Sequence, residues 1–251
     1  MNHYKRNRIY ITESEQIKLK DYKVLIAGSG IGSVIAECAL RLGFENITIV
    51  DGDIVELTNL NRQNYVYKDI GKTKTESIAM RLRSINPNAN IKVHDQFITT
   101  DNVSSFIEQH DVAVNALDFT SEVPFTFDEI CQSKNIPVLH PYNIGWVGLV
   151  FVVMPDGKNL SFLSDDYYQF EKAVVGFVLQ KLADSPSHTK EWISNVLLEY
   201  GNENGKLPPP QLSVGSYLLA GGCAHLLYKL ALNLSVRKLP EFYLYGLEDT
   251  I

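Results

Sequence analysis

Cysteine is scarce in this chain. Its 251 residues include three cysteines, Cys38, Cys131 and Cys223, and no C-x-x-C pair. Isolated cysteines argue against a disulfide framework and against a four-thiolate zinc site, so we predict no zinc and a reducing, cytoplasmic setting. Long apolar runs are absent too, because no stretch approaches the roughly 20 apolar residues of a membrane span. The basic N-terminus lacks the apolar segment of a signal peptide, and we expect no membrane partner.

Positive charge is in deficit. Lysine and arginine total 23 against 29 aspartates and glutamates, and the formal net charge of −6 is spread along the chain. A protein that binds nucleic acid mainly through phosphates favours a basic face, so this balance argues against a nucleic-acid partner. The hydrophobic fraction of 45% is enough for a globular protein with a core.

Strand and helix patterns alternate over the first part of the chain. The pattern predicts strands at 23–27, 46–50, 91–94, 111–116 and from 137. Between them it predicts helices at 33–42, 73–86, 103–109 and 122–134. This alternation predicts the α/β class, with a doubly wound, Rossmann-like and mainly parallel sheet.

The pattern changes after an apolar strand at 148–154, where apolar residues fall at helical spacing. We expect helices through 170–181 and 192–200, a long helix at 214–233 and an edge strand at 241–246. The chain is interpreted as a single domain in four parts: an N-terminal arm (1–21), a nucleotide-binding core (22–157), a helical insertion that selects substrate (158–210), and a C-terminal helix with an edge strand (211–251).

A glycine-rich turn follows the first predicted strand. Gly28, Gly30 and Gly32 let the backbone approach a phosphate at the N-terminus of a helix. The dinucleotide fingerprint G-x-G-x-x-G would place a further glycine at the position of Ser33. By itself this turn therefore indicates either a nucleotide site or a tight turn without a ligand.

An acid ends the second strand about 20 residues later, at the place where a ribose is bound in such folds. This residue, Asp51, does not separate ATP from NAD. Cationic and amide side chains that follow Asp51 distinguish ATP from NAD, because arginine binds phosphate through a planar fork and lysine acts as a point charge. These residues, which favour a triphosphate, are Asn59, Arg62, Gln63 and Lys74.

Asp118 follows the fourth strand, at the carboxyl edge where ligands of doubly wound folds lie. Its carboxylate suits Mg²⁺, which takes one or two carboxylates together with substrate phosphates. The alternative is that Asp118 caps the helix that follows. The chemistry alone leaves both interpretations open.

Several blocks together resemble one family. They are H-Y-K-R-N, L-K-D-Y-K-V-L-I-A-G-S-G, D-G-D-I-V-E-L-T-N-L-N-R-Q, G-K-T-K-T-E-S, R-S-I-N-P-N-A-N-I, H-D-V-A-V-N-A-L-D and P-P-P-Q-L-S-V-G-S-Y-L-L-A-G-G-C-A-H-L-L-Y-K. In this order they are similar to the ThiF/MoeB/HesA family, the bacterial relatives of the ubiquitin-activating enzymes. The resemblance covers about residues 3–155 and 208–246.

The resemblance implies ATP-dependent adenylation of a carboxylate, with ATP and Mg²⁺ as cofactors and pyrophosphate as the leaving group. It implies a homodimer, in which Arg6 reaches into the partner's site. The implied nucleotide-binding residues are Gly28, Gly30, Gly32, Asp51, Asp53, Asn59, Arg62, Gln63 and Lys74. The implied catalytic residues are Arg6, Arg62, Lys74 and Asp118, of which Asp118 is the Mg²⁺ ligand.

The chain also departs from the family pattern. The glycine turn is one residue shorter than G-x-G-G-x-G, and the paired C-x-x-C motifs are missing. No cysteine lies between Cys131 and Cys223, where members that form a thioester or persulfide keep one, and we expect both to be buried. The chemistry would then end at the adenylate or at a nucleophile that attacks it.

Two residues beyond these motifs have open interpretations. His140, at the end of a predicted strand, is interpreted as a hydrogen-bonded structural histidine, with lining of a substrate pocket as the alternative. Trp146 lies between two glycines and is interpreted as a packing residue, with substrate contact as the alternative.

We expect the carboxylate to belong to a small carrier protein, a peptide or a small molecule. One competing hypothesis is an NAD-dependent oxidoreductase, which keeps the glycine turn and Asp51 but leaves Arg6, Arg62 and Lys74 without a role. The other is a non-catalytic, dimeric nucleotide-binding module.

Overall fold

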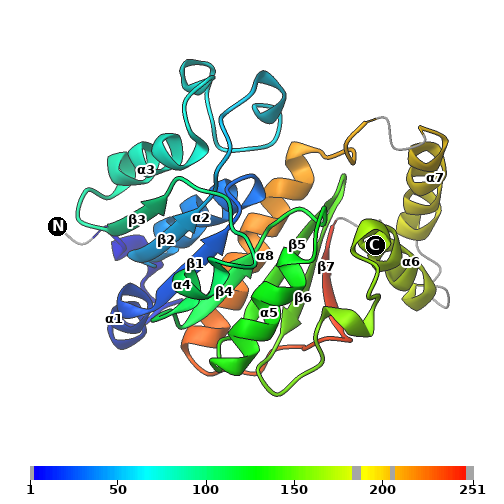
Figure 1. The fold of residues 1–251 in the computed structure, drawn as a ribbon. Helices are drawn as coiled ribbons and strands as arrows, with labels where there is room; N and C mark the ends of the chain where they lie inside the picture. The colour runs from blue at the N-terminus through cyan, green and yellow to red at the C-terminus, as the bar shows by residue number, and fades with distance from the viewer. Residues whose placement is uncertain (1–2, 183–187, 204–206, 247–251) are drawn as a thin grey trace.

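A seven-stranded sheet in the order β3-β2-β1-β4-β5-β6-β7 forms the centre of the molecule (Figure 1). The structure is a computed structural model that describes residues 3–182, 188–203 and 207–246. β1 to β5 are parallel, β6 is antiparallel to β5, and β7 is antiparallel to β6. The strands are β1 (Lys23–Ala27), β2 (Asn46–Val50), β3 (Asn90–His94), β4 (Val112–Asn115), β5 (Val138–Ile144), β6 (Val147–Val153) and β7 (Phe242–Tyr245).

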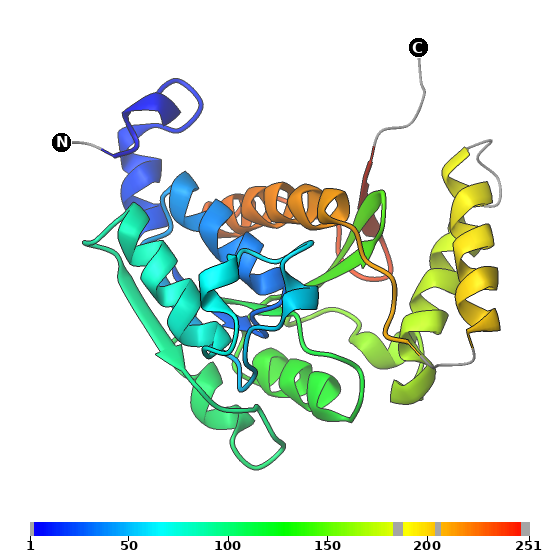
Figure 2. The same cartoon turned by 90° about the horizontal axis from the view of Figure 1, so that it is seen from above.

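Helices cover both faces of this sheet (Figure 2). One hydrophobic cluster joins the sheet to α1 (Glu13–Asp21), α2 (Ile31–Leu42), α3 (Lys74–Ile85) and α8 (Ser213–Ala231). A second cluster joins the opposite face to α4 (Val103–Ile107), α5 (Val123–Ser133) and α6 (Phe170–Lys181). The predicted α/β class and doubly wound, mainly parallel sheet are confirmed.

The local sequence explains where the first elements begin and end. β1 and β2 have the expected bounds because both are short apolar runs buried in the sheet. The helix expected at 33–42 begins two residues earlier, at Ile31, because Gly30 is its N-cap. It ends at Gly43, whose φ of +129° suits a glycine after a helix.

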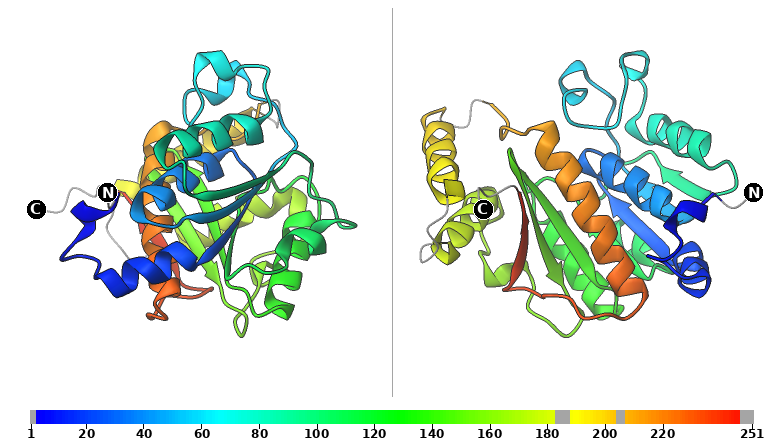
Figure 3. Two further views of the ribbon diagram at one scale, coloured as in Figure 1. Left: turned by 90° about the vertical axis from the view of Figure 1, so that its left-hand side faces the viewer. Right: turned by 180° about the vertical axis from the view of Figure 1, so that it is seen from behind.

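The segment between β6 and α8 contains α6 and α7 (His188–Asn202), which pack against each other beside the β5–β7 end of the sheet (Figure 3). Phe170, Val174 and Val178 are buried against the sheet. This one-sided packing leaves the other side of α6 facing α7. In the described ranges, no helix combines the length and apolarity needed to cross a membrane.

The N-terminal arm lies at the C-terminal end of α2. Asn7 Nδ2 donates to Leu42 O at 2.9 Å, and Ile11 is buried against the core. Arg6 lies in a short 3₁₀ helix (Lys5–Asn7) and is exposed. α2 is about 18 Å long by its helical rise, so Arg6 lies far from the glycine turn of its own chain.

Candidate active site

The glycine turn brings β1 close to the segment that follows β4. Gly28 has φ +89°, and a Cβ there would lie 2.4 Å from Ala116 O. Gly28 N donates to Val50 O at 2.9 Å, so the turn is held to β2 as well. Only glycine combines this positive φ with so close an approach to Ala116 O. As a result, the chain from Ala116 to Asp118 runs beside the turn.

Gly28→Ala is expected to destabilise the protein by at least about 2 kcal/mol, because a left-handed backbone and a clash with a carbonyl act together. Gly71→Ala is the matched control: its φ is +84°, but no atom lies within 4 Å of the added Cβ. Chemical denaturation measures the free energy of unfolding of both variants, and Gly28→Ala should lose clearly more stability than Gly71→Ala. Equal losses would mean that the close approach at Ala116 does not matter.

The other two glycines of the motif, Gly30 and Gly32, have different structural roles. Gly30 caps α2, whereas Gly32 lies inside the helix, where a Cβ would lie 2.6 Å from Ile26 Cγ2. Gly32 therefore sets the close packing of α2 on β1, and the turn proper consists of Gly28–Gly30. Ser33 occupies the fingerprint's last glycine position: its Oγ donates to Gly30 O at 2.7 Å and accepts from Asn64 N at 3.0 Å.

Asp51, at the end of β2, turns back toward the glycine turn. Its carboxylate accepts Ser29 N at 2.6 Å and Asp53 N at 2.8 Å. Burial raises the pKa of Asp51, while Lys74 and these two N–H groups act against the rise. The acid is thereby fixed beside the turn, where an adenosine ribose would lie.

Lys74 is the first residue of α3 and is buried, with a relative exposure of 8%. Its Nζ lies 2.8 Å from Asp53 Oδ2. Burial and pairing hold the ammonium group near Asp51 and Asp118, and Lys74 opposes the rise in the pKa of both carboxyls. Lys74 therefore lies close to two of the acids with which the sequence predicts it to form the nucleotide site, Asp51 and Asp118.

The loop between β2 and α3 carries the other polar residues. Arg62 Nη1 donates to Thr58 O at 2.9 Å, and Arg62 Nε donates to Gln211 Oε1. Burial lowers the pKa of Arg62 and Asp118 opposes this shift, so the two residues face a shared region. Asn59 is buried, and its Oδ1 accepts Glu56 N at 2.9 Å.

Gln63 lies over the glycine turn. A Cβ at Gly30 would lie 3.3 Å from Gln63 Nε2. Gln63 Oε1 is buried and has no hydrogen-bond partner in the described part of the chain. A buried amide oxygen without a partner is costly, which is typical of a group that waits for a ligand.

A buried carboxylate anchors this loop to the helices behind it. Glu37 on α2 accepts hydrogen bonds from Asn64 Nδ2 at 2.7 Å, from Arg41 Nε at 2.8 Å and from Arg81 Nε. Burial raises the pKa of Glu37, but the hydrogen bonds from Arg81 and Arg41 outweigh it and the net shift is downward. The network joins α2, α3 and the loop, and so fixes Arg62 and Gln63 relative to the turn.

Asp118 lies beyond the end of β4. The α5 helix has Glu122 as its N-cap and begins at Val123, so Asp118 does not cap it. Within the described ranges its carboxylate has no hydrogen-bond or ion-pair partner. Burial raises the pKa of Asp118; Lys74 and Arg62 act against the rise, and Asp53 and Asp51 add to it.

The carboxylate of Asp118 would accommodate a divalent cation, because it has no partner in the described ranges and the negative charges of Asp51 and Asp53 act on it. No group of three or more histidine, cysteine, aspartate or glutamate residues able to hold a metal occurs in the ranges that the structure describes. A Mg²⁺ ion here would therefore take most of its ligands from phosphates and water, as Mg²⁺ usually does.

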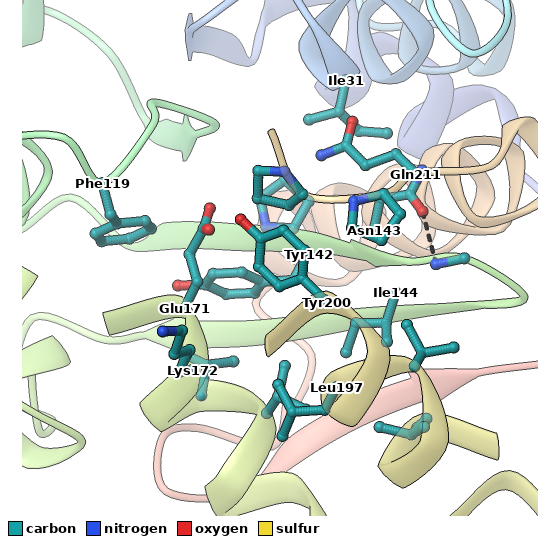
Figure 4. A pocket seen from close by; sticks show the side chains of 18 of the residues that line it. Ile31, Phe119, Tyr142, Asn143, Ile144, Glu171, Lys172, Leu197, Tyr200 and Gln211 are labelled. Carbon is teal, nitrogen blue, oxygen red and sulfur yellow. Dashed lines mark hydrogen bonds between the residues drawn. The ribbon is translucent and has the colours of Figure 1, made fainter. Parts of the chain in front are cut away.

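A cavity of about 410 Å³ opens beside Asp118 (Figure 4). It lies between the β5–β6 hairpin, α6, α7 and the segment that leads into α8. Its volume is in the range of small-molecule sites. Its lining includes the side chains of Asp118, Tyr142, Trp146, Glu171, Tyr200 and Gln211.

The two open interpretations have different outcomes. His140 is buried, with a relative exposure of 1%, and its Nε2 lies 2.8 Å from Asp128 Oδ2, so the structural role is confirmed. The packing role expected for Trp146 is wrong, because this side chain is 59% exposed and lines the cavity. The hairpin tip has φ +62° at Gly145, and it places Trp146 at the cavity shared with α6 and α7 rather than in the core.

Sequence reasoning missed three cavity residues. Gln211 lies in the P-P-P-Q-L-S block, but nothing in that block indicates its contact with Arg62, 149 residues away. Tyr142 and Glu171 carried no local signal at all. The structure brings the predicted residues at 28–74 and 118 to one edge of the sheet, whereas Arg6 lies at the opposite end of α2.

This fold and this edge define a doubly wound α/β protein in which cations face a carboxylate beside a glycine turn. The chain matches the ThiF family over residues 4–245 and belongs to that family. The expected resemblance is confirmed. The family assignment gives no support to the oxidoreductase or to the non-catalytic module.

The chain aligns with only part of the length of individual relatives. The sulfur carrier protein ThiS adenylyltransferase of Bacillus subtilis (strain 168) is 32% identical over 158 residues, which are 61% of this chain and 47% of that protein. The tRNA threonylcarbamoyladenosine dehydratase of Escherichia coli (strain K12) is 34% identical over 134 residues, which are 53% of this chain and 50% of that protein. The chain thus spans about half the length of these curated relatives.

Solved structures share the fold over nearly the whole chain. An E. coli MccB structure with MccA-N7isoASN has a TM-score of 0.71 and 20% identity, and covers 99% of this chain and 72% of that chain. The E. coli tRNA N6-threonylcarbamoyladenosine dehydratase TcdA has a TM-score of 0.66 and 21% identity, and the match covers 92% of this chain and 94% of that chain. At these identities the likeness concerns the fold alone.

Proposed function

We propose that the protein catalyses ATP-dependent adenylation of a carboxylate. The observation that carries this proposal is the arrangement at one sheet edge. There Lys74 and Arg62, beside the glycine turn, act on Asp118, which has no partner among the described residues and lines a cavity of about 410 Å³. Cations beside the turn suit a triphosphate, and the cavity suits the molecule that it activates.

In the proposed reaction a carboxylate oxygen of the substrate attacks the α-phosphorus of ATP. The bond from that phosphorus to the pyrophosphate oxygen breaks, and an acyl-adenylate and pyrophosphate result. Lys74 and Arg62 stabilise the charge on the phosphate oxygens, and the N–H groups at the start of α2 bind a phosphate. Mg²⁺ held by Asp118 would supply further neutralisation of that charge.

The structure supports an end point at the adenylate rather than at an enzyme thioester. Cys131 and Cys223 are fully buried, and burial raises the pKa of both thiols. Burial likewise raises the pKa of the half-buried Cys38. A thiol held in its neutral form is a poor nucleophile, so an external nucleophile is the better candidate to attack the adenylate.

The substrate carboxylate is proposed to come from the end of a small carrier protein, from a peptide or from a small molecule. A structure of MccB with MccA is among those that share the fold, and ThiS is the sulfur carrier protein in a relative's name. The acidic balance of the chain argues against a nucleic-acid substrate, and a cytoplasmic setting stays a prediction.

ATP–pyrophosphate exchange tests the proposal directly. Purified protein, ATP, Mg²⁺ and labelled pyrophosphate are incubated with a panel of carboxylates, and exchange that depends on one carboxylate is expected. Intact ATP binding without exchange for any carboxylate in a panel that includes the products of neighbouring genes would contradict the proposal.

A homodimer with shared sites is also proposed. Arg6 cannot reach the glycine turn of its own chain, which lies at the other end of α2. Next to it, Ile9 and Tyr10 are 92% and 85% exposed, and an exposed apolar patch is typical of an interface. A second copy that covers this arm would carry Arg6 into the neighbouring site.

If Arg6 acts in trans, Arg6→Ala and Asp118→Asn should each be inactive, while their unfolded and refolded mixture regains exchange. Only a mixed dimer has one intact site, so about one site in four recovers. Lys5→Ala, a neighbouring arm variant, should keep full activity. A mixture no more active than its components, or a monomer in light scattering, would rule out the shared site.

A further inference from the structure

Glu171, on α6, lines the cavity and has no ion-pair or hydrogen-bond partner among the residues that the structure describes. Figure 4 shows its carboxylate directed into the cavity from the helix, on the side of Tyr142 and Phe119. Burial raises its pKa, and Asp118 raises it further. Glu171 is exposed in the cavity, where water solvates its carboxylate. A ligand that fills the cavity would displace that water, and the described residues that line the cavity near this carboxylate provide no positive charge to replace it.

Tyr142, on β5, presents a second unsatisfied group to the same part of the cavity. Its hydroxyl oxygen is buried and has no hydrogen-bond partner in the described ranges. Burial raises the pKa of Tyr142, so the hydroxyl keeps its proton and can both donate and accept. A buried hydroxyl without a partner is costly unless a ligand satisfies it.

The walls around these two groups are aromatic. The cavity is lined by Phe119, Trp146, Trp192 and Tyr200 in addition to Tyr142. The rings of Phe119 and Phe170 are stacked with centroids 4.4 Å apart, which fixes one wall against α6. Ring faces attract cations, and a carboxylate beside ring faces favours an ammonium or guanidinium group.

The only cation that lines this cavity, within the described residues, is Lys172. Lys172 is exposed, and in Figure 4 it lies away from the carboxylate of Glu171. On the nucleotide side, Lys74 is paired with Asp53 at 2.8 Å. A substrate that bears only a carboxylate would therefore be repelled by Glu171, and a positive charge on the substrate removes this repulsion.

We propose that Glu171 and Tyr142 bind a positively charged group of the substrate, close to the carboxylate that is activated. This inference rests on the proposed adenylation. The substrate is then a short peptide with a basic residue at its end or an amino-acid derivative with a free amine. A tail of glycines has no side chain to fill a cavity of about 410 Å³ or to meet Glu171.

Two matched pairs of carboxylates test the proposal. Ac-Ala-Ala-Lys and Ac-Ala-Ala-Met differ in a side-chain charge, while methionine and N-acetylmethionine differ in the α-ammonium group. Binding is measured by calorimetry with Mg²⁺ and an α,β-methylene analogue of ATP. We expect the cationic member of one pair to bind about 10-fold tighter or more, and the pair that shows this identifies the source of the charge.

Glu171→Gln should reduce this preference to about 2-fold, and Tyr142→Phe should reduce it partially. Glu171→Lys should favour Ac-Ala-Ala-Glu over Ac-Ala-Ala-Lys. The matched control is Glu199→Gln, which removes an exposed carboxylate from α7 outside the cavity lining and should keep the wild-type preference.

No preference in the wild type, or a preference that survives Glu171→Gln, overturns the proposal. A variant that changes the Mg²⁺ requirement and keeps the preference also overturns it, because Glu171 would then serve the metal. Exchange of pyrophosphate is measured in parallel. A preference without exchange for any carboxylate means that the proposed adenylation fails while the cation site stands.

Discussion

Asp118→Asn is expected to lower the rate of ATP–pyrophosphate exchange by about 10³-fold, with the fold intact. The amide keeps the size of the side chain and removes the charge that would hold Mg²⁺ at the phosphates, and such charge stabilisation is worth this much in phosphoryl transfer. Exchange under saturating ATP and Mg²⁺ measures the loss. ATP binding without Mg²⁺ should be unchanged or tighter, because one negative charge is gone.

The same substitution, Asp118→Asn, is expected to raise the stability of the ligand-free protein although it lowers the exchange rate. Burial raises the pKa of Asp118 in the folded protein, so its ionised form disfavours folding. In the window between the unfolded and the raised folded pKa, the folded state binds more protons and stability rises as the pH falls. At neutral pH the ligand-free Asp118→Asn protein should therefore melt at or above the wild type, and the difference should vanish in acid. A lower melting temperature at neutral pH would show that Asp118 is a structural residue.

Lys74→Ala is expected to lower exchange by about 10² to 10³-fold, through a higher KM for ATP and a lower kcat. The side chain is buried and its ammonium lies 2.8 Å from Asp53. Its removal therefore takes away the proposed phosphate partner and leaves three acids, Asp51, Asp53 and Asp118, without the nearby cation. Steady-state kinetics with varied ATP separate the two effects.

Lys72→Ala is the control for Lys74→Ala. Lys72 is more exposed, and its Nζ lies 3.9 Å from Asp69, so its ion pair contributes little. Its activity should stay within about 2-fold of the wild type. If Lys72→Ala and Lys74→Ala lose activity equally, the role of Lys74 is general electrostatics rather than a contact with phosphate.

The order of strands and helices could be predicted because it depends on local signals. β1 and β2 are apolar runs bounded by a polar residue and an acid or glycine, and they have the expected bounds. The error at α2 also has a local cause, since Gly30 rather than Gly32 caps the helix. The predicted position of Asp118 at the carboxyl edge follows from the parallel order of β1 and β4.

The second half of the site could not be predicted, because it depends on contacts between distant segments. Arg62 meets Gln211 across 149 residues. The position of Trp146 between two glycines favours packing, but the side chain is 59% exposed and lines the cavity. Whether an aromatic residue packs or lines a cavity depends on which helix covers it, and periodicity does not report that.

The sequence by itself determined the α/β class, the glycine turn and the acids and cations that follow it, because propensity, turn chemistry and motif spacing act over a few neighbouring residues. Only the tertiary structure decided that α6 and α7 enclose a cavity against the β5–β6 hairpin. It alone placed Glu171 in the lining of that cavity, beside a Tyr142 hydroxyl that is buried without a hydrogen-bond partner in the described residues. These features depend on long-range packing, in which the burial of apolar faces fixes how helices lie and leaves a few polar groups turned toward the space between them.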